Sequence, residues 1–155
     1  MGPDPLREIF NNKILAITLT VWAIAQSFKV LMGVVRERRF NFRWFIGTGG
    51  MPSSHTAGAS ALATTCGLVY GFDSAIFALA AVFALVTMFD AQGVRRATGQ
   101  QAELLNQILD DIYWKGKLES NRLIELIGHT PIQVFTGAII GISFAILLHD
   151  LWIKQ

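Results

Sequence analysis

The chain has 155 residues, a length typical of one domain; 52% of them are hydrophobic and only 15% are charged. Soluble domains carry about a quarter charged residues, so this composition excludes an ordinary soluble domain and indicates that a bilayer surrounds much of the chain. A formal net charge of +2 is too small to predict nucleic-acid binding, and the single cysteine, Cys66, excludes an internal disulfide.

Four apolar runs predict an all-α integral membrane bundle that forms a single domain over residues 1–155. The spans are expected at about 13–33, 54–71, 74–91 and 131–149. The apolar runs themselves are about 15 to 18 residues long, short of the roughly 20 that a helix needs to cross the hydrocarbon core, so buried core helices of a soluble protein are the alternative. Four such runs leave too little amphipathic chain to cover them, which favours membrane helices. Two glycine pairs, Gly67 with Gly71 and Gly137 with Gly141, predict close helix packing either inside the bundle or across a homodimer.

The connection between the third and fourth runs is polar but has helical periodicity. Over about 99–112, apolar residues recur at helical spacing opposite a charged face, as in an amphipathic helix that lies on the membrane surface or over the bundle. A second short helix is expected over 118–127, ending at Gly128, so that His129 precedes the fourth span.

The segment between the first and second runs carries the most informative pattern, Gly-Gly-Met-Pro-Ser-Ser-His at 49–55. Two glycines free the backbone, a proline fixes one φ angle, and serines are preferred helix N-caps, so a tight loop leading into a helix is expected. The first turn of such a helix offers unpaired N–H groups and the positive end of the helix dipole to an anion such as phosphate. His55 lies in this turn, where its ring can exchange a proton with that anion.

The uneven distribution of basic residues predicts an orientation. With four crossings, the two long connections share one side, and they hold all 13 lysines and arginines except Arg7, Lys13 and Lys154. The positive-inside rule then places these connections, together with His55 and His129, on the cytoplasmic side. Three of these basic residues have another interpretation: Arg38, Arg39 and Arg43 would form an interfacial cluster that binds anionic lipid.

Three motifs in this order resemble the divergent branch of the PAP2 (type 2 phosphatidic acid phosphatase) superfamily: residues 49–55, Asp-Ala-Gln-Gly-Val-Arg-Arg at 90–96, and Gly-His-Thr-Pro at 128–131. The resemblance runs from about 29 to 141. The wider superfamily uses Lys-x6-Arg-Pro, Pro-Ser-Gly-His and Ser-Arg-x5-His-x3-Asp elements. Lys29 and Arg36 fit the first, with Glu37 in place of proline, and Ser54 replaces the glycine of the second. Gln133 stands where the third has aspartate and where the divergent branch usually has glutamate.

The resemblance implies a phosphatase that needs no metal or other cofactor and acts on a lipid phosphomonoester. His129 would attack phosphorus to form a phosphohistidine, while His55 protonates the leaving alkoxide and then activates water. Polar side chains would hold the phosphate, with Asp90 as a charge partner or site member: Lys29, Arg36, Ser53, Ser54, Arg95, Arg96 and Arg122. Arg122 stands one residue too far from His129, so Arg95 or Arg96 is the alternative third arginine.

Gln133 has two interpretations. As the partner of the nucleophile, an amide orients the ring but supplies no charge, which predicts weaker activity than glutamate would give, as in an engineered or inactive form. Thr130 and Gln133 also match a capping box, which makes Gln133 purely structural. A hydrolase pair of Ser54 and His55 is disfavoured because adjacent helical residues point apart. His149 is expected at the opposite interface.

The sequence also leaves alternatives for the identity of the substrate and for the functional class of the protein. The expected orientation favours phosphatidylglycerophosphate or phosphatidate as the lipid partner, and a prenyl (di)phosphate is the alternative substrate. A non-catalytic protein that binds or transports a lipid phosphate would keep the same basic pocket, and a vanadate-type oxidase would need it as well. The damaged third motif favours the non-catalytic alternative.

Overall fold

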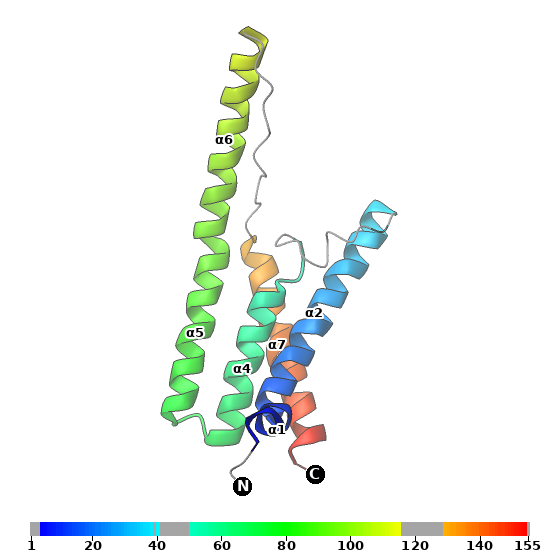
Figure 1. Ribbon diagram of the computed structural model, residues 1–155, viewed down its shortest axis with the longest axis vertical. Helices are drawn as coiled ribbons and strands as arrows, with labels where there is room; N and C mark the ends of the chain where they lie inside the picture. The colour runs from blue at the N-terminus through cyan, green and yellow to red at the C-terminus, as the bar shows by residue number, and fades with distance from the viewer. Residues whose placement is uncertain (1–3, 39, 41–49, 116–128, 155) are drawn as a thin grey trace.

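The computed structural model describes residues 4–38, 40, 50–115 and 129–154, and only the backbone of 94–98 and 111–115. Within this part the chain forms α1 (Pro5–Phe10), α2 (Lys13–Glu37), α4 (Ser54–Tyr70), α5 (Ala75–Gln92), α6 (Val94–Lys115) and α7 (Pro131–Trp152) (Figure 1). The predicted all-α membrane bundle is confirmed: α2, α5 and α7 are each long and apolar enough to cross a membrane. The remaining predicted span, the second at 54–71, corresponds to α4, a helix of 17 residues. The short helix predicted over 118–127 lies outside the described residues.

Helix α4 is the centre of the bundle and contacts α2, α5 and α7. Its buried residues are all small (Gly, Ala, Ser, Thr and Cys), which allows this position. One buried cluster joins α4 to α2 and α7: Ile17, Val21, Ala25, Ala57, Ala61 and Ala145. A second joins it to α5: Ala59, Ala63, Cys66, Ala80 and Ala84.

Large apolar side chains lie on the outside of this bundle. Leu79, Phe89 and Ile132 are 74%, 73% and 69% exposed. Water would oppose such exposure, but lipid tails are as apolar as leucine, so close contact between small residues decides which faces meet. The distribution of small and large residues is therefore that of a bundle in hydrocarbon.

Gly137 and Gly141 bring α7 against α4. A Cβ on Gly137 would lie 2.5 Å from the carbonyl oxygen of Ser53, and a Cβ on Gly141 would collide with the carbonyl oxygen of Ala57. For this pair, packing inside the bundle is the interpretation that the structure supports. Such close contact leaves room for hydrogen at these two positions and for nothing larger.

Gly67 and Gly71 do not form the packing face predicted from their spacing. Gly71 ends α4 with a φ of 91°, a backbone conformation that favours glycine, and the ring of Phe72 covers Gly67. Ser74 then begins α5, its hydroxyl accepting the N–H of Phe77 over 3.1 Å. These two glycines therefore shape the turn between α4 and α5.

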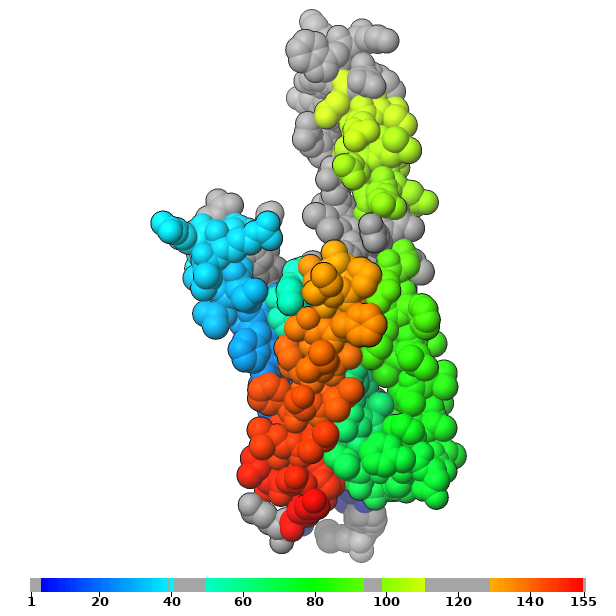
Figure 2. Space-filling model, turned by 180° about the vertical axis from the view of Figure 1, so that it is seen from behind, coloured from blue at the N-terminus to red at the C-terminus, as the bar shows by residue number. Residues whose placement is uncertain are grey.

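Helix α6 continues in nearly the same direction as α5 and extends beyond the end of the bundle (Figures 1 and 2). Gly93, between the two helices, has a φ of −89° and a ψ of −75°, so the chain does not reverse there. Within the described residues, α6 contacts α5 but not α2, α4 or α7. Of the two predicted placements of the amphipathic helix, the one over the bundle is thus wrong and the one on the membrane surface stays a prediction; the helix begins earlier than residue 99.

Candidate functional site

The predicted catalytic residues lie at the end of the bundle where α4 and α7 begin, opposite the chain termini (Figure 1). The Ser53 N–H donates to the carbonyl oxygen of Gln133 over 3.2 Å and ties the first turns of α4 and α7 together. The His129 N–H donates to the carbonyl oxygen of Ala91 over 3.1 Å, near the end of α5. Backbone hydrogen bonds thus assemble this end from three well-separated segments of the chain: the start of α4, the end of α5 and the start of α7.

The His129 ring has a defined tautomer. Oε1 of Gln133 accepts the Thr130 N–H over 3.0 Å, and this donor identifies it as the amide oxygen. The same oxygen lies 3.1 Å from Nδ1 of His129. An amide oxygen can only accept, so Nδ1 must carry the hydrogen and, in the neutral ring, Nε2 carries the lone pair.

Gln133 therefore combines the two interpretations that the sequence left open. It is residue N3 of a capping box at the start of α7, and its side chain also orients the imidazole of His129. His129 is only 2% exposed, and hydrogen bonds are stronger in such low-dielectric surroundings. The cap and the ring orientation depend on the same oxygen atom.

The start of α4 has the local structure predicted from its sequence. Ser53 is the N-cap; its hydroxyl oxygen accepts the Thr56 hydroxyl at 3.0 Å and lies 3.4 Å from the Thr56 N–H. Ser53 is fully buried and Ser54 is 3% exposed, whereas His55 is exposed. Ser53 is thus a structural cap, and His55 is the polar side chain that this turn presents outward.

Lys29 of α2 lies against the loop that leads into α4. A Cβ added to Gly50, whose φ is 101°, would lie 3.3 Å from Cε and 3.4 Å from Cγ of Lys29. The lysine stem therefore packs over this glycine, and the residue is only 7% exposed. A residue with a side chain at position 50 would occupy the space of the lysine stem and would be strained as well.

The structure gives less detail for the other predicted phosphate ligands than for Lys29. Arg36 is exposed in the last turn of α2, about 10 Å along the helix from Lys29 and on the same side. Asp90 is half-buried in the last turn of α5, next to Ala91. Arg95 and Arg96 belong to the first turn of α6, and only their backbone is described. Arg122 lies outside the described residues, as do Arg39 and Arg43.

The arrangement is electrostatically suited to an anion. The first turns of α4 and α7 are adjacent, so two positive helix-dipole ends lie side by side. The ammonium-bearing Lys29 lies beside the loop before α4. Fixed backbone dipoles, a lysine and two imidazoles are the groups that stabilise a phosphate and exchange protons with it.

Sequence reasoning missed two contributors to this site. The Ala91 carbonyl positions the backbone of His129, and no sequence signal identifies a carbonyl acceptor. Gly137 was expected only to pack helices, but its contact with Ser53 is also what lets Gln133 reach the start of α4. The sequence signal that could have identified this role is the position of Gly137, one helical turn after Gln133.

His149 lies at the opposite end of α7, as expected, and is buried. Its Nδ1 is 3.4 Å from Oδ1 of Asp150, which also pairs with Lys154 at 3.0 Å. Lys13 donates to the Trp152 carbonyl over 2.6 Å and ties the start of α2 to the end of α7. This end is separate from the candidate site and offers a control histidine.

Comparison with known proteins agrees with the motifs. Residues 10–144 match the Divergent PAP2 family. The chain is 39% identical over 152 residues to a Bacillus subtilis (strain 168) protein described as "Uncharacterized membrane protein YuiD", an alignment that covers 91% of this chain and 96% of that protein. No solved structure matches the chain.

Proposed function

The chain belongs to the Divergent PAP2 family, and on that premise we propose that it is a metal-independent membrane phosphatase that hydrolyses a lipid phosphomonoester through a phosphohistidine. The observation that carries the proposal is the hydrogen bond between Nδ1 of His129 and Oε1 of Gln133. It directs the Nδ1 hydrogen to Gln133 and so leaves the lone pair on Nε2, the nitrogen that has to act as nucleophile.

In the first step, Nε2 of His129 forms a bond to phosphorus as the bond from phosphorus to the lipid oxygen breaks. Protonated His55 gives its proton to the leaving alkoxide, and the lipid alcohol departs. In the second step, neutral His55 takes a proton from water, and the resulting hydroxide displaces the imidazole from phosphorus. The balance is one water consumed, with one alcohol and one inorganic phosphate released.

The charge on the phosphoryl group is met by the fixed groups of the site. The adjacent helix N-termini and Lys29 would hold the phosphate oxygens, and Arg36, Arg95 and Arg96 are the candidates for completing the anion site. Burial of His129 strengthens these interactions, because screening by water is weak there. Such a preorganised site lowers the barrier without a metal ion.

The proposed substrate side is the cytoplasmic leaflet. Arg7, Lys13 and Lys154 lie in the segments at the end of the bundle that holds the termini, whereas, among the described residues, Lys29, Arg36 and Arg38 belong to the later turns and C-cap of α2, toward the opposite end. This asymmetry favours a lipid intermediate made in the cell, phosphatidate or phosphatidylglycerophosphate, as the substrate. A prenyl (di)phosphate is the substrate to compare with it.

Gln133 itself supports one rival, a protein that binds or transports a lipid phosphate without cleaving it. The imidazolium formed during attack would face a neutral amide in place of a carboxylate. That loss of charge lowers the rate but leaves the binding groups intact. The rival therefore predicts binding of lipid phosphates without release of phosphate.

The test is phosphate release by the purified protein in detergent from phosphatidate, phosphatidylglycerophosphate and a prenyl phosphate. We expect release from at least one lipid, and its loss in both His129→Ala and His55→Ala. His149→Gln is the matched control, because it changes the third histidine at the far end of the bundle and should keep wild-type release. Rapid alkaline quenching should trap acid-labile phosphate on the wild-type chain.

Release that survives both substitutions would reject the histidine mechanism. Binding of the lipids without release, in the wild type and in Gln133→Glu, would establish the non-catalytic rival. Loss of release in His149→Gln to the same extent as in His129→Ala would show that the assay reports folding instead of chemistry.

A further inference from the structure

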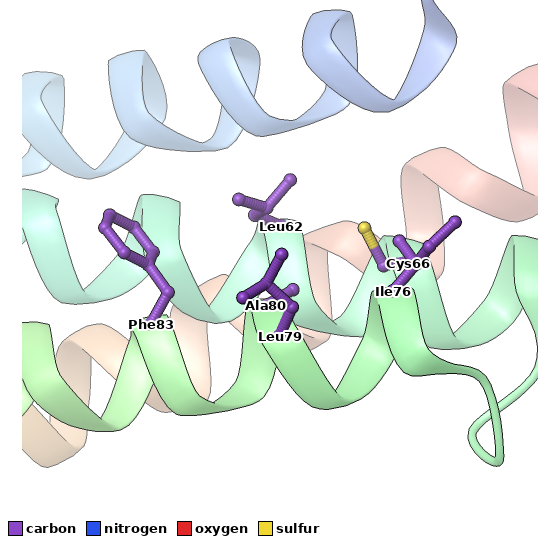
Figure 3. Close-up of a pocket in the computed structure, with 6 residues that line it drawn as sticks. All are labelled: Leu62, Cys66, Ile76, Leu79, Ala80 and Phe83. Carbon is purple, nitrogen blue, oxygen red and sulfur yellow. The ribbon is translucent and has the colours of Figure 1, made fainter.

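An apolar groove lies between α4 and α5 (Figure 3), and on α4 it begins about two helical turns from the end that holds the candidate site. Its volume is about 470 Å³, and its lining is Leu62 and Cys66 from α4 with Ile76, Leu79, Ala80 and Phe83 from α5. This volume is within the range of about 300–1,000 Å³ that small-molecule sites occupy. Five of the six lining side chains are hydrocarbons and the sixth is a thiol, so the groove suits a hydrocarbon ligand.

The groove is aligned with the candidate site along both of its helices. On α4, at 100° per residue, Leu62 and Cys66 each fall within about 20° of His55, one on either side, so the three lie on one stripe about 40° wide with His55 above the other two. On α5, residues 83 and 90 are likewise separated by about 20°, which places Asp90 above Phe83. A ligand lying along these stripes would have one end at His55 and Asp90 and the other in the groove.

The depth of the groove matches the length of a lipid chain. At 1.5 Å per residue, Leu62 lies about 12 Å and Cys66 about 18 Å along α4 from Ser54. One leaflet contributes about 15 Å of the hydrocarbon core, so a chain whose headgroup is at the site reaches this depth with its distal part. Short chains would end before Leu62.

We infer that this groove binds the distal part of the hydrocarbon chain of the lipid phosphate whose headgroup occupies the histidine site. The inference rests on the proposed function for the identity of that headgroup. Because lipid tails are as apolar as the groove, the groove alone gains little over bulk lipid. The phosphate anchors the molecule, and the groove then favours a chain long enough to fill it.

Photo-crosslinking tests this binding without relying on turnover. The probe is phosphatidate with a diazirine at the distal end of one acyl chain, at low mole fraction in phosphatidylcholine vesicles that contain the full chain. Adducts are mapped by mass spectrometry, and their mass shows whether the phosphate is retained. Phosphatidylcholine carrying the same diazirine chain is the headgroup control, and phosphate release is measured in parallel.

We expect adducts within 62–66 and 76–83, about tenfold more with the phosphatidate probe than with the phosphatidylcholine probe, since only phosphatidate has a terminal phosphomonoester, whose extra charge and free oxygens strengthen its hydrogen bonds to the site. Ala80→Phe fills the groove and should remove these adducts, and Ala78→Phe on the exposed side of α5 should keep them. Ile76→Trp, at a half-exposed rim position, blocks the far end if Ala80→Phe fails to fold.

Equal labelling by both probes, or adducts outside the groove, would overturn the inference. Groove labelling by phosphatidate without any phosphate release would reject the phosphatase and keep the chain site. Phosphate release without groove labelling would reject the chain site alone.

Discussion

Replacing Gly137 with alanine tests whether contact between α4 and α7 sets the geometry at His129. The added Cβ would lie 2.5 Å from the Ser53 carbonyl oxygen and 3.2 Å from Cβ of Thr56. Since real Cβ atoms essentially never come closer than 3.0 Å to such an atom, the two helices must separate by about half an ångström. Neither neighbour is the flexible end of a long side chain, so the backbone has to move.

That separation acts directly on the site. The hydrogen bond from the Ser53 N–H to the Gln133 carbonyl is already 3.2 Å, the upper limit of ordinary geometry, and half an ångström more would break it. Overpacking of this kind lowers the free energy of unfolding by about 1–3 kcal/mol. A displaced nucleophile lowers the rate as well, by up to about a hundredfold for a misplacement of 1 Å.

Two alanine variants provide matched controls. A Cβ on Gly58 would make ordinary 3.5 Å contacts with Trp22, so Gly58→Ala should retain stability and turnover. Gly141→Ala overpacks the same two helices one turn farther from His129 and should lose stability with less effect on turnover per folded molecule. Thermal unfolding in detergent and phosphate release measure the two effects. If Gly137→Ala matched Gly58→Ala in both, the link between helix contact and site geometry would be refuted.

Three further substitutions test other parts of the account. Gln133→Glu should raise phosphate release by at least about tenfold, because a carboxylate keeps both hydrogen bonds and stabilises the imidazolium; unchanged release would contradict this role. Lys29→Met should weaken binding of phosphatidate vesicles more than Arg36→Met does, since Lys29 packs against the loop before α4 while Arg36 is exposed; equal losses would argue against a site at Lys29. Gly71→Ala should lower the free energy of unfolding by about 1–3 kcal/mol, because its φ of 91° and ψ of 144° are sparsely populated by residues other than glycine, and should leave release per folded molecule unchanged; a thermal unfolding curve identical to that of the wild type would exclude the strain.

The local features of the chain were predictable because they depend on neighbouring residues. The apolar runs indicated the membrane helices, and the capping signals of Ser53 and Thr130 indicated where α4 and α7 begin. The periodicity of 99–112 identified a helix, but the direction of α6 depends on the backbone angles of Gly93. The spacing of Gly67 and Gly71 was misleading because a turn uses glycine for its φ angle as readily as a helix pair uses it for close contact.

By itself, the sequence determined an all-helical membrane bundle with a capped helix start next to each of two candidate histidines, because composition, periodicity and capping act over a few residues. Only the tertiary structure decided which glycine pair joins α4 to α7, and that the Ser53 and Gln133 backbones meet there. It also decided that one oxygen of Gln133 both caps α7 and holds Nδ1 of His129. The direction of that ring depends on the Ala91 carbonyl and on helix contacts between segments far apart in the chain, which local patterns do not encode.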